Sequence, residues 1–97
     1  MEIKIKSLKF DADQKLIAYV EKKVDKLERF CDELDTVDVT LSLLSEPDNK
    51  NVQIQTHVLG QDVIIERNAK TFEEAVTDAA DAMKEKLTRV KEKLFEA

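Results

Sequence analysis

The 97-residue chain contains one glycine, one proline, one cysteine and one histidine, and these scarcities exclude several kinds of site. A single glycine cannot build the glycine-rich loop that cradles phosphates in nucleotide-binding enzymes. The lone cysteine, Cys31, excludes an internal disulfide and a multi-cysteine metal site, and it fits a reducing compartment. The lone histidine, His57, has no cysteine or aspartate at metal-ligand spacing. We therefore predict no metal, no cofactor, no small-molecule substrate and no enzymatic activity.

The chain also lacks long hydrophobic runs. None approaches the roughly 20 apolar residues that span a membrane, and residues 1–6 lack the apolar core of a signal peptide. We therefore expect a cytoplasmic protein that does not contact a membrane. With 42% hydrophobic and 38% charged residues, the chain has the composition of one soluble globular domain, residues 1–97.

Several segments alternate between apolar and polar residues, the period of two that is typical of half-buried strands. They are residues 2–6, 36–44, 52–59 and the segment that follows the only glycine. Gly60 supplies the positive φ that a two-residue hairpin turn needs at its first position, so the turn is predicted at Gly60 and Gln61. That register places Val58 opposite Val63, with the apolar residues on one face. The opposite face is expected to be exposed and to hold Gln53, Gln55, His57, Ile64 and Glu66.

Two further segments carry apolar residues at steps of three and four, the period of an amphipathic helix. The first runs from about Asp13 to Asp32, and its stripe comprises Leu16, Val20, Val24, Leu27, Cys31 and Leu34. The second runs from Thr71 to Leu94, and its stripe comprises Phe72, Val76, Ala79, Met83, Leu87, Val90 and Leu94. Asp11 or Asp13 is expected to cap the first helix, and Thr71 the second. Cys31 lies on an apolar stripe, so we expect it to be buried and inert.

The predicted order is strand, helix, strand, strand, strand, helix. One apolar sheet face matches two helical stripes, and the other face is polar. The predicted fold class is therefore α+β: a two-layer β-α-β-β-β-α domain with a four-stranded sheet and both helices on one face. The strand–helix–strand crossover is expected to be parallel, and the two hairpin connections antiparallel.

The formal net charge of −5 argues against nonspecific binding of nucleic acid, yet positive charge gathers on both predicted helices. On the first helix, one sector opposite the apolar stripe holds Lys15, Lys22, Lys26 and Arg29, with Lys23 to one side. On the second helix, the last half holds Lys84, Lys86, Arg89, Lys91 and Lys93. These cations indicate either solvated helices with weak ion pairs along their exposed faces or a surface that binds a polyanion. The residues alone leave both interpretations open.

Residues 10–16 (FDADQKL), 19–30 (YVEKKVDKLERF) and 71–83 (TFEEAVTDAADAM) resemble the ribosome hibernation-promoting factors. This family is also described as ribosome-associated inhibitors or ribosomal subunit interface proteins. The resemblance covers the whole chain, and the chain resembles the short form of the family. It implies a double-stranded-RNA-binding-like arrangement of the predicted elements. It also implies a non-catalytic bacterial factor that occupies the mRNA and tRNA channel of the small ribosomal subunit. Such a factor inhibits translation and preserves idle ribosomes in stationary phase or stress.

The resemblance carries over to individual residues. The Lys-x-x-Lys-Leu-Glu segment of the family corresponds to residues 23–28, and its second-helix pattern is matched by Asp81, Leu87, Arg89 and Lys91. Three positions that are commonly basic in the family hold Ile17, Ala82 and Glu85, which lowers the positive potential. The implied partner is the small ribosomal subunit, through its rRNA and its proteins, and the implied state is a monomer.

Two helices side by side over one sheet would present a row of cations to the phosphates of folded rRNA. The predicted RNA-binding residues are Lys22, Lys23, Lys26, Arg29, Lys86, Arg89, Lys91 and Lys93. The alternative is a small protein-binding module that uses its acidic surface or the polar sheet face, and the negative net charge favours it.

Overall fold

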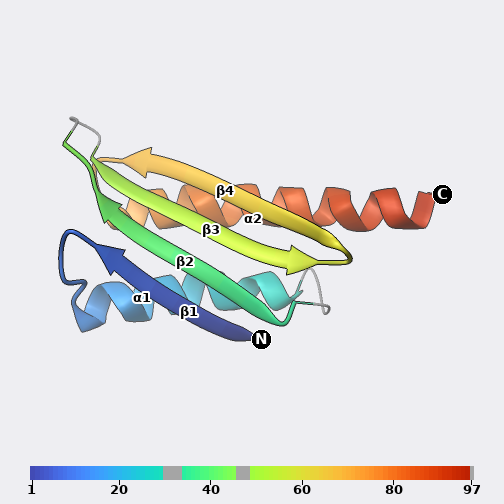
Figure 1. The fold of residues 1–97 in the computed structure, drawn as a ribbon, viewed down its shortest axis with the longest axis horizontal. Helices are drawn as coiled ribbons and strands as arrows, with labels where there is room; N and C mark the ends of the chain where they lie inside the picture. Colours follow the sequence, from blue (N-terminus) through green and yellow to red (C-terminus); the bar gives the residue numbers. More distant parts are fainter. Residues whose placement is uncertain (30–33, 46–48, 97) are drawn as a thin grey trace.

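A computed structural model describes residues 1–29, 34–45 and 49–96, with the backbone alone for residues 94–96. In chain order the elements are β1 (Glu2–Leu8), α1 (Gln14–Asp25), the 3-10 helix η1 (Lys26–Arg29), β2 (Thr36–Leu43), β3 (Lys50–Val58), β4 (Gln61–Ala69) and α2 (Phe72–Glu96). The strands form one sheet in the order β1-β2-β3-β4, with β1 parallel to β2 and the other pairs antiparallel. The predicted α+β fold class and strand directions are confirmed (Figure 1).

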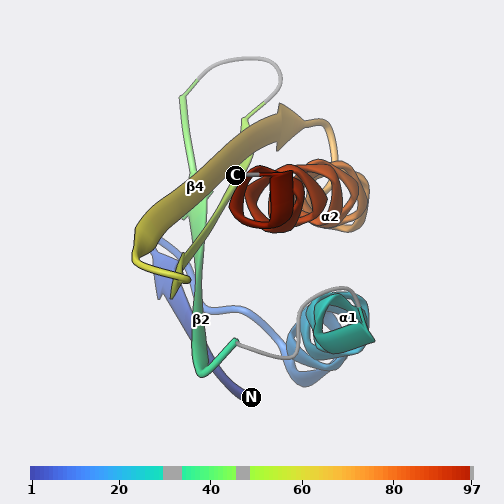
Figure 2. The same ribbon diagram turned by 90° about the vertical axis from the view of Figure 1, so that its right-hand side faces the viewer.

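Both helices cover the same face of the sheet, as Figure 2 shows. Their apolar stripes and the inner sheet face share one core, in which Leu41, Ile54, Met83 and Leu87 are fully buried. This two-layer arrangement hides the apolar side of every element and leaves the outer sheet face in contact with water. Among the described residues, no helix has the length and apolar character that a membrane crossing requires.

Side-chain caps determine where both helices begin. Asp13 Oδ1 accepts a hydrogen bond from the backbone N–H of Leu16 at 2.8 Å. Thr71 Oγ1 accepts one from the backbone N–H of Glu74 at 3.1 Å. Each cap gives a partner to an N–H group that the first turn of a helix leaves unpaired. The predicted caps are confirmed.

The first helix ends earlier than predicted. α1 stops at Asp25, and the chain tightens into η1 as far as Arg29. Four predicted stripe residues are buried in these two helices: Leu16, Val20, Val24 and Leu27. Leu34 is buried after the helices end, and Cys31 lies outside the described residues.

The β3–β4 turn also differs from the prediction. Leu59 and Gly60 form the turn, with φ angles of 51° and 79°, and β4 begins at Gln61. Val58 therefore pairs with Gln61 and not with Val63, so the predicted register is wrong by two residues. Because side chains alternate with a period of two, the apolar residues keep their face. Positive φ at both central positions is the geometry of a type I′ turn, and a leucine rarely adopts it.

Two strand ends lie beyond their predicted limits. β1 continues to Leu8, and Lys9, with a φ of 69°, follows it directly. β3 begins at Lys50, before its predicted start at residue 52, and β4 ends at Ala69. The longer strands extend the sheet under both helices without changing the order of elements.

Candidate nucleic-acid interface

A groove lies between the C-terminal part of the first helix and α2. The described residues that line it are Lys23, Lys26, Leu27, Arg29, Thr77, Ala80, Asp81 and Lys84. Leu27 and Ala80 are only 2% and 8% exposed, so they form an apolar floor. The volume of the groove is about 190 Å³. Lys23, Lys26 and Arg29 thus line one side of a small apolar depression and do not stand on a flat surface.

Tyr19 joins the two helices beside this groove. Its hydroxyl lies 2.9 Å from Thr77 Oγ1. Thr77 Oγ1 itself donates to the backbone carbonyl of Glu73 at 2.9 Å, which uses its only hydrogen, so the Tyr19 hydroxyl is the donor. The ammonium group of Lys23 lies 5.5 Å from the centroid of the Tyr19 ring, a cation–π distance. The contact between the helices therefore also positions one cation of the groove.

Three of the four predicted cations on the first helix line the groove, and we call Lys23, Lys26 and Arg29 the cation row. They follow at intervals of three, and the three-residue turn of η1 aligns them. Lys22 instead lines a shallow hollow with Ile3, on the β1 side of α1. The predicted sector grouped Lys22 with Lys26 and Arg29 and set Lys23 apart. In the structure Lys23 lies with Lys26 and Arg29, and Lys22 lies apart. An α-helical projection fails here because the helix type changes after Asp25.

The cations of α2 lie on two flanks of the helix. Lys84 lines the groove, whereas Lys86 Nζ donates to the backbone carbonyl of Ile64 on β4 at 3.3 Å. At about 100° per residue, the groove flank holds Lys84 and Lys91, and the β4 flank holds Lys86, Arg89 and Lys93. Only one of the four predicted α2 cations therefore shares a side with the cation row.

Lys84 lines the groove although the predicted site omits it. It follows Thr77 by seven residues, or two helical turns, so both occupy the same flank of α2. The repeat of seven is visible in the sequence. The sequence does not show which flank faces the first helix, because that depends on the contact between Tyr19 and Thr77.

The start of β1 is tied to η1 at the edge of this surface. The amino group of Met1 donates a hydrogen bond to Glu28 Oε1 at 2.9 Å. This hydrogen bond, together with the negative charge of Glu28, raises the pKa of the amino group above its ordinary value of 8.0. The contact holds η1, which carries Lys26 and Arg29, against the sheet.

We expect Glu28→Gln to return the pKa of the Met1 amino group toward 8.0, because an amide carries no charge. The ion pair needs a protonated amine, so its stabilising effect is present below pH 8 and is lost as the pH rises through the raised pKa. Thermal unfolding should show the variant less stable than the wild type at pH 7 and equal to it when the amine is deprotonated.

Glu92→Gln, an exposed change on α2, is the control and should show no such pH dependence. An unchanged amino pKa in the Glu28→Gln protein, measured by NMR titration, would argue against the contact.

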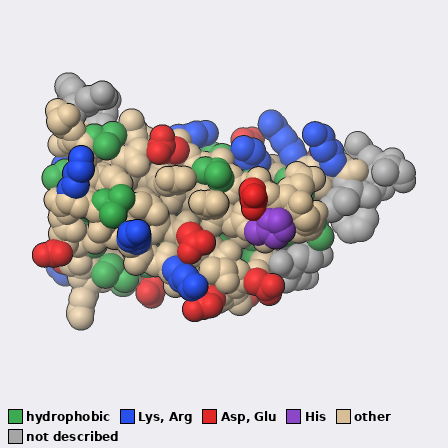
Figure 3. Space-filling view, in the orientation of Figure 1, with side chains coloured by type: hydrophobic (Ala, Val, Ile, Leu, Met, Phe, Trp, Pro, Cys, Tyr) green, Lys and Arg blue, Asp and Glu red, His purple; other side chains and the backbone are tan. Residues whose placement is uncertain are grey.

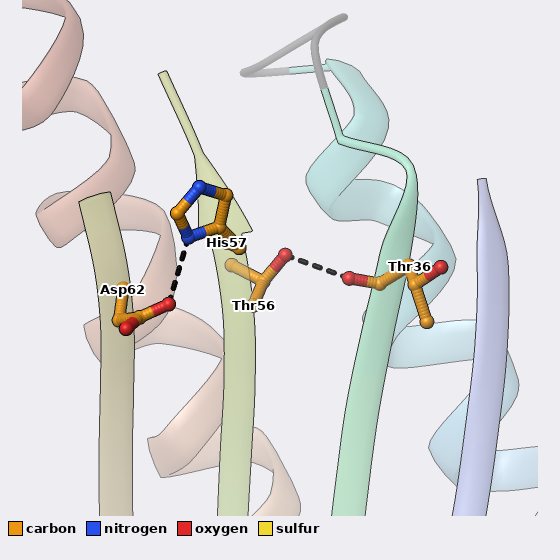
Figure 4. Close-up of polar contacts among 4 residues, drawn as sticks. All are labelled: Thr36, Thr56, His57 and Asp62. Atoms are coloured by element: carbon orange, nitrogen blue, oxygen red, sulfur yellow. Dashed lines mark hydrogen bonds and ion pairs between the residues drawn. The ribbon is translucent and has the colours of Figure 1, made fainter. Parts of the chain in front are cut away.

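The outer face of the sheet is polar, as predicted. Gln55 and His57 are exposed there, and His57 Nδ1 lies 2.7 Å from Asp62 Oδ1 across the β3–β4 pair (Figure 4). The neighbouring Thr56 points to the inner face, where its hydroxyl donates to the backbone carbonyl of Thr36 at 2.8 Å. Within residues 1–29, 34–45 and 49–93, no three His, Cys, Asp or Glu side chains gather as a metal site would require. His57 is a surface residue, as the sequence predicts.

Residues 3–94 match the protein family described as sigma 54 modulation protein / S30EA ribosomal protein. The chain is 28% identical over 96 residues to a ribosome hibernation promoting factor from Azotobacter vinelandii. That alignment covers 99% of this chain and 88% of the relative. The similarity therefore extends over the complete fold and not over one motif.

Solved structures give the same result. The N-terminal domain of Protein Y from Thermus thermophilus has a TM-score of 0.80 and 28% identity, and the match covers 93% of this chain and 99% of that one. A ribosomal subunit interface protein from Coxiella burnetii has a TM-score of 0.85 over 94% of this chain and 98% of its own, and at 16% identity it shows likeness of fold alone. Since the family match spans almost the whole chain, this protein belongs to the sigma 54 modulation protein / S30EA ribosomal protein family.

Proposed function

We propose that this protein is a ribosome-associated factor that occupies the mRNA and tRNA channel of the small subunit. There it inhibits translation and preserves idle ribosomes in stationary phase or stress. The family is non-catalytic, so the protein is not an enzyme. The name of its relative from Azotobacter vinelandii supports ribosome hibernation. A factor that binds bacterial ribosomes acts in the cytoplasm, and we propose that it binds as a monomer, as one domain.

One observation carries this proposal: the cation row stands along a groove between two helices that are packed on one sheet. Folded RNA is recognised largely through its shape and its phosphates, which basic side chains on a rigid support can contact. The hydrogen bond between Tyr19 and Thr77 keeps the two walls of the groove together. The backbone that carries the cation row is therefore held against α2 before any RNA arrives.

The second half of α2 presents cations in two directions. Figure 3 shows Lys and Arg side chains gathered along the edge of the molecule over this half of the helix. The first half, Phe72–Met83, carries acidic residues and no lysine or arginine. Cations on both flanks suit a helix that lies between two RNA segments, as it would in a channel lined by rRNA. The RNA is expected to contact the last turns of α2 as well as the groove wall that Thr77, Ala80 and Asp81 form.

A protein-binding module is the alternative function, and the outer sheet face favours it. Ile64, on that face, is 44% exposed, and His57 and Asp62 form an exposed pair there. The net charge of −5 would suit a basic protein partner. This function would leave the cation row without a role.

Sedimentation of tagged protein with ribosomes from growing and from starved cells separates these two functions. Recovery with ribosomal particles from starved cells is the result expected for the hibernation factor. Recovery only in a light protein complex would favour the protein-binding module.

We expect the affinity for ribosomes to fall as the salt concentration rises. Each phosphate that a lysine or arginine neutralises releases bound counterions, which contributes about −0.7 to −0.9 to the slope of log K against log salt. With several contacts the slope should reach several units. Co-sedimentation across a series of potassium chloride concentrations measures it, and a flat response would exclude a mechanism based on phosphate contacts.

A further inference from the structure

The groove between η1 and α2 combines three chemical features in one small space. Leu27 and Ala80 supply an apolar floor. The cation row supplies positive charge at the rim. Of the described residues that line the groove, Asp81 alone is acidic. A ligand that fits this groove must therefore satisfy an apolar surface, several cations and one carboxylate together.

A phosphate group alone would meet only one of these needs. The cation row would attract it, but the carboxylate of Asp81 would repel it, and the apolar floor would gain nothing. A nucleotide meets all three, because its base can cover the apolar floor while its phosphate contacts the cation row. The remaining requirement is that the base offers hydrogen-bond donors to Asp81, because a carboxylate only accepts.

Guanine matches a carboxylate better than the other bases do. Its Watson–Crick edge carries adjacent N–H donors on N1 and N2, which the two oxygens of one carboxylate can accept in parallel. Adenine, cytosine and uracil each place an acceptor beside the donor on that edge, and the carboxylate repels this acceptor. The chemistry of the groove therefore discriminates among bases and not only between RNA and other polymers.

We propose that this groove binds one unpaired guanine nucleotide of the RNA partner and that Asp81 selects the base. The inference rests on the proposed function, since it specifies which nucleotide the RNA-binding surface takes. The groove volume of about 190 Å³ is smaller than the roughly 300–1,000 Å³ of pockets for drug-sized ligands, and it suits a single base. The hydrogen bond between Tyr19 and Thr77 fixes the spacing of the two walls that enclose this base.

The test compares two single-stranded RNA pentamers, UUGUU and UUAUU, by fluorescence anisotropy with the full chain. We expect UUGUU to bind about tenfold more tightly, the discrimination typical of one paired hydrogen-bond contact to a base. Asp81→Asn and Asp81→Ala should reduce this ratio to within about twofold. Asp78→Asn is the matched control, because it removes the same charge from an exposed position one turn earlier on α2 and should keep the ratio.

Equal binding of the two pentamers by the wild type would overturn the inference, as would a preference for guanine that survives both changes at Asp81. Circular dichroism of each variant shows that the fold is retained. Ribosome co-sedimentation separates this inference from the function on which it rests. A protein that co-sediments but does not discriminate between the pentamers refutes the guanine site alone. A protein that discriminates but does not co-sediment refutes the proposed function alone.

Discussion

The double change Lys26→Glu with Arg89→Glu is expected to abolish ribosome co-sedimentation and to relieve inhibition in a cell-free translation assay. Lys26 belongs to the cation row, and Arg89 projects on the β4 flank of α2, so the pair tests both sides of the proposed surface at once. Each reversal converts an attraction to a phosphate into a repulsion. Both side chains are exposed, so the melting temperature should stay within about 5 °C of the wild type.

The matched control is Lys4→Glu with Lys6→Glu, on exposed positions of β1 that face away from the helices. It changes the net charge by the same amount on the outer sheet face. We expect this control to keep most of its ribosome binding. A folded Lys26/Arg89 double variant that still binds and inhibits would remove the helices from the RNA-binding surface and would favour the protein-binding module.

Met83→Asp is expected to unfold much of the protein. The Met83 side chain is completely buried in the core between α2 and the sheet. The change removes apolar burial and places a carboxylate where no water can solvate it, so we expect a loss of about 3–5 kcal/mol in the free energy of unfolding. That is a large part of the roughly 5–15 kcal/mol that stabilises a domain of ordinary size. Urea denaturation followed by circular dichroism measures this loss.

Met83→Leu is the control for this change, because it keeps the volume and the apolar character of the side chain. It should cost less than about 1.5 kcal/mol. If Met83→Asp unfolded at the same urea concentration as Met83→Leu, the packing of α2 against the sheet would differ from the arrangement described here.

The order of elements and the two-layer fold could be predicted from the sequence because each element has an unbroken pattern. The stripe of α2 repeats at steps of three and four without glycine or proline, so its buried face follows directly from residues such as Val76, Met83 and Leu87. The strands alternate cleanly, so even a register error of two residues left their faces correct. Periodicity fixes which side of an element is buried, and it does so without long-range information.

Details that depend on backbone choices were harder to predict. The turn at Leu59 and Gly60 requires positive φ at a leucine, a cost that the pairing of two long strands outweighs. The change from α1 to η1 has no clear sequence signal, yet it brings Lys26 and Arg29 into line with Lys23. One altered turn of helix thus decides which cations share a surface.

The division of the α2 cations between two flanks could not be predicted for a different reason. A helical projection shows that Lys84 and Lys86 lie on different flanks, but it does not show which flank has a neighbouring helix. That information comes from tertiary contacts, such as the hydrogen bond from Lys86 to Ile64. The guanine-selecting groove also depends on tertiary contacts, because its walls come from segments about 50 residues apart that only the folded chain brings together.

The parallel pairing of β1 with β2 joins residues 34 positions apart, since Glu2 pairs with Thr36, whereas β2–β3 and β3–β4 are local hairpins. Closing such a long loop costs more chain entropy than closing a hairpin, and β1 is also an edge strand. We therefore expect the unit of β1 and α1 to detach more readily than the hairpins and α2. One wall of the groove belongs to this unit, so a nucleotide bound there would also hold the unit against α2. We therefore expect RNA binding in the groove to raise the local stability of the N-terminal third.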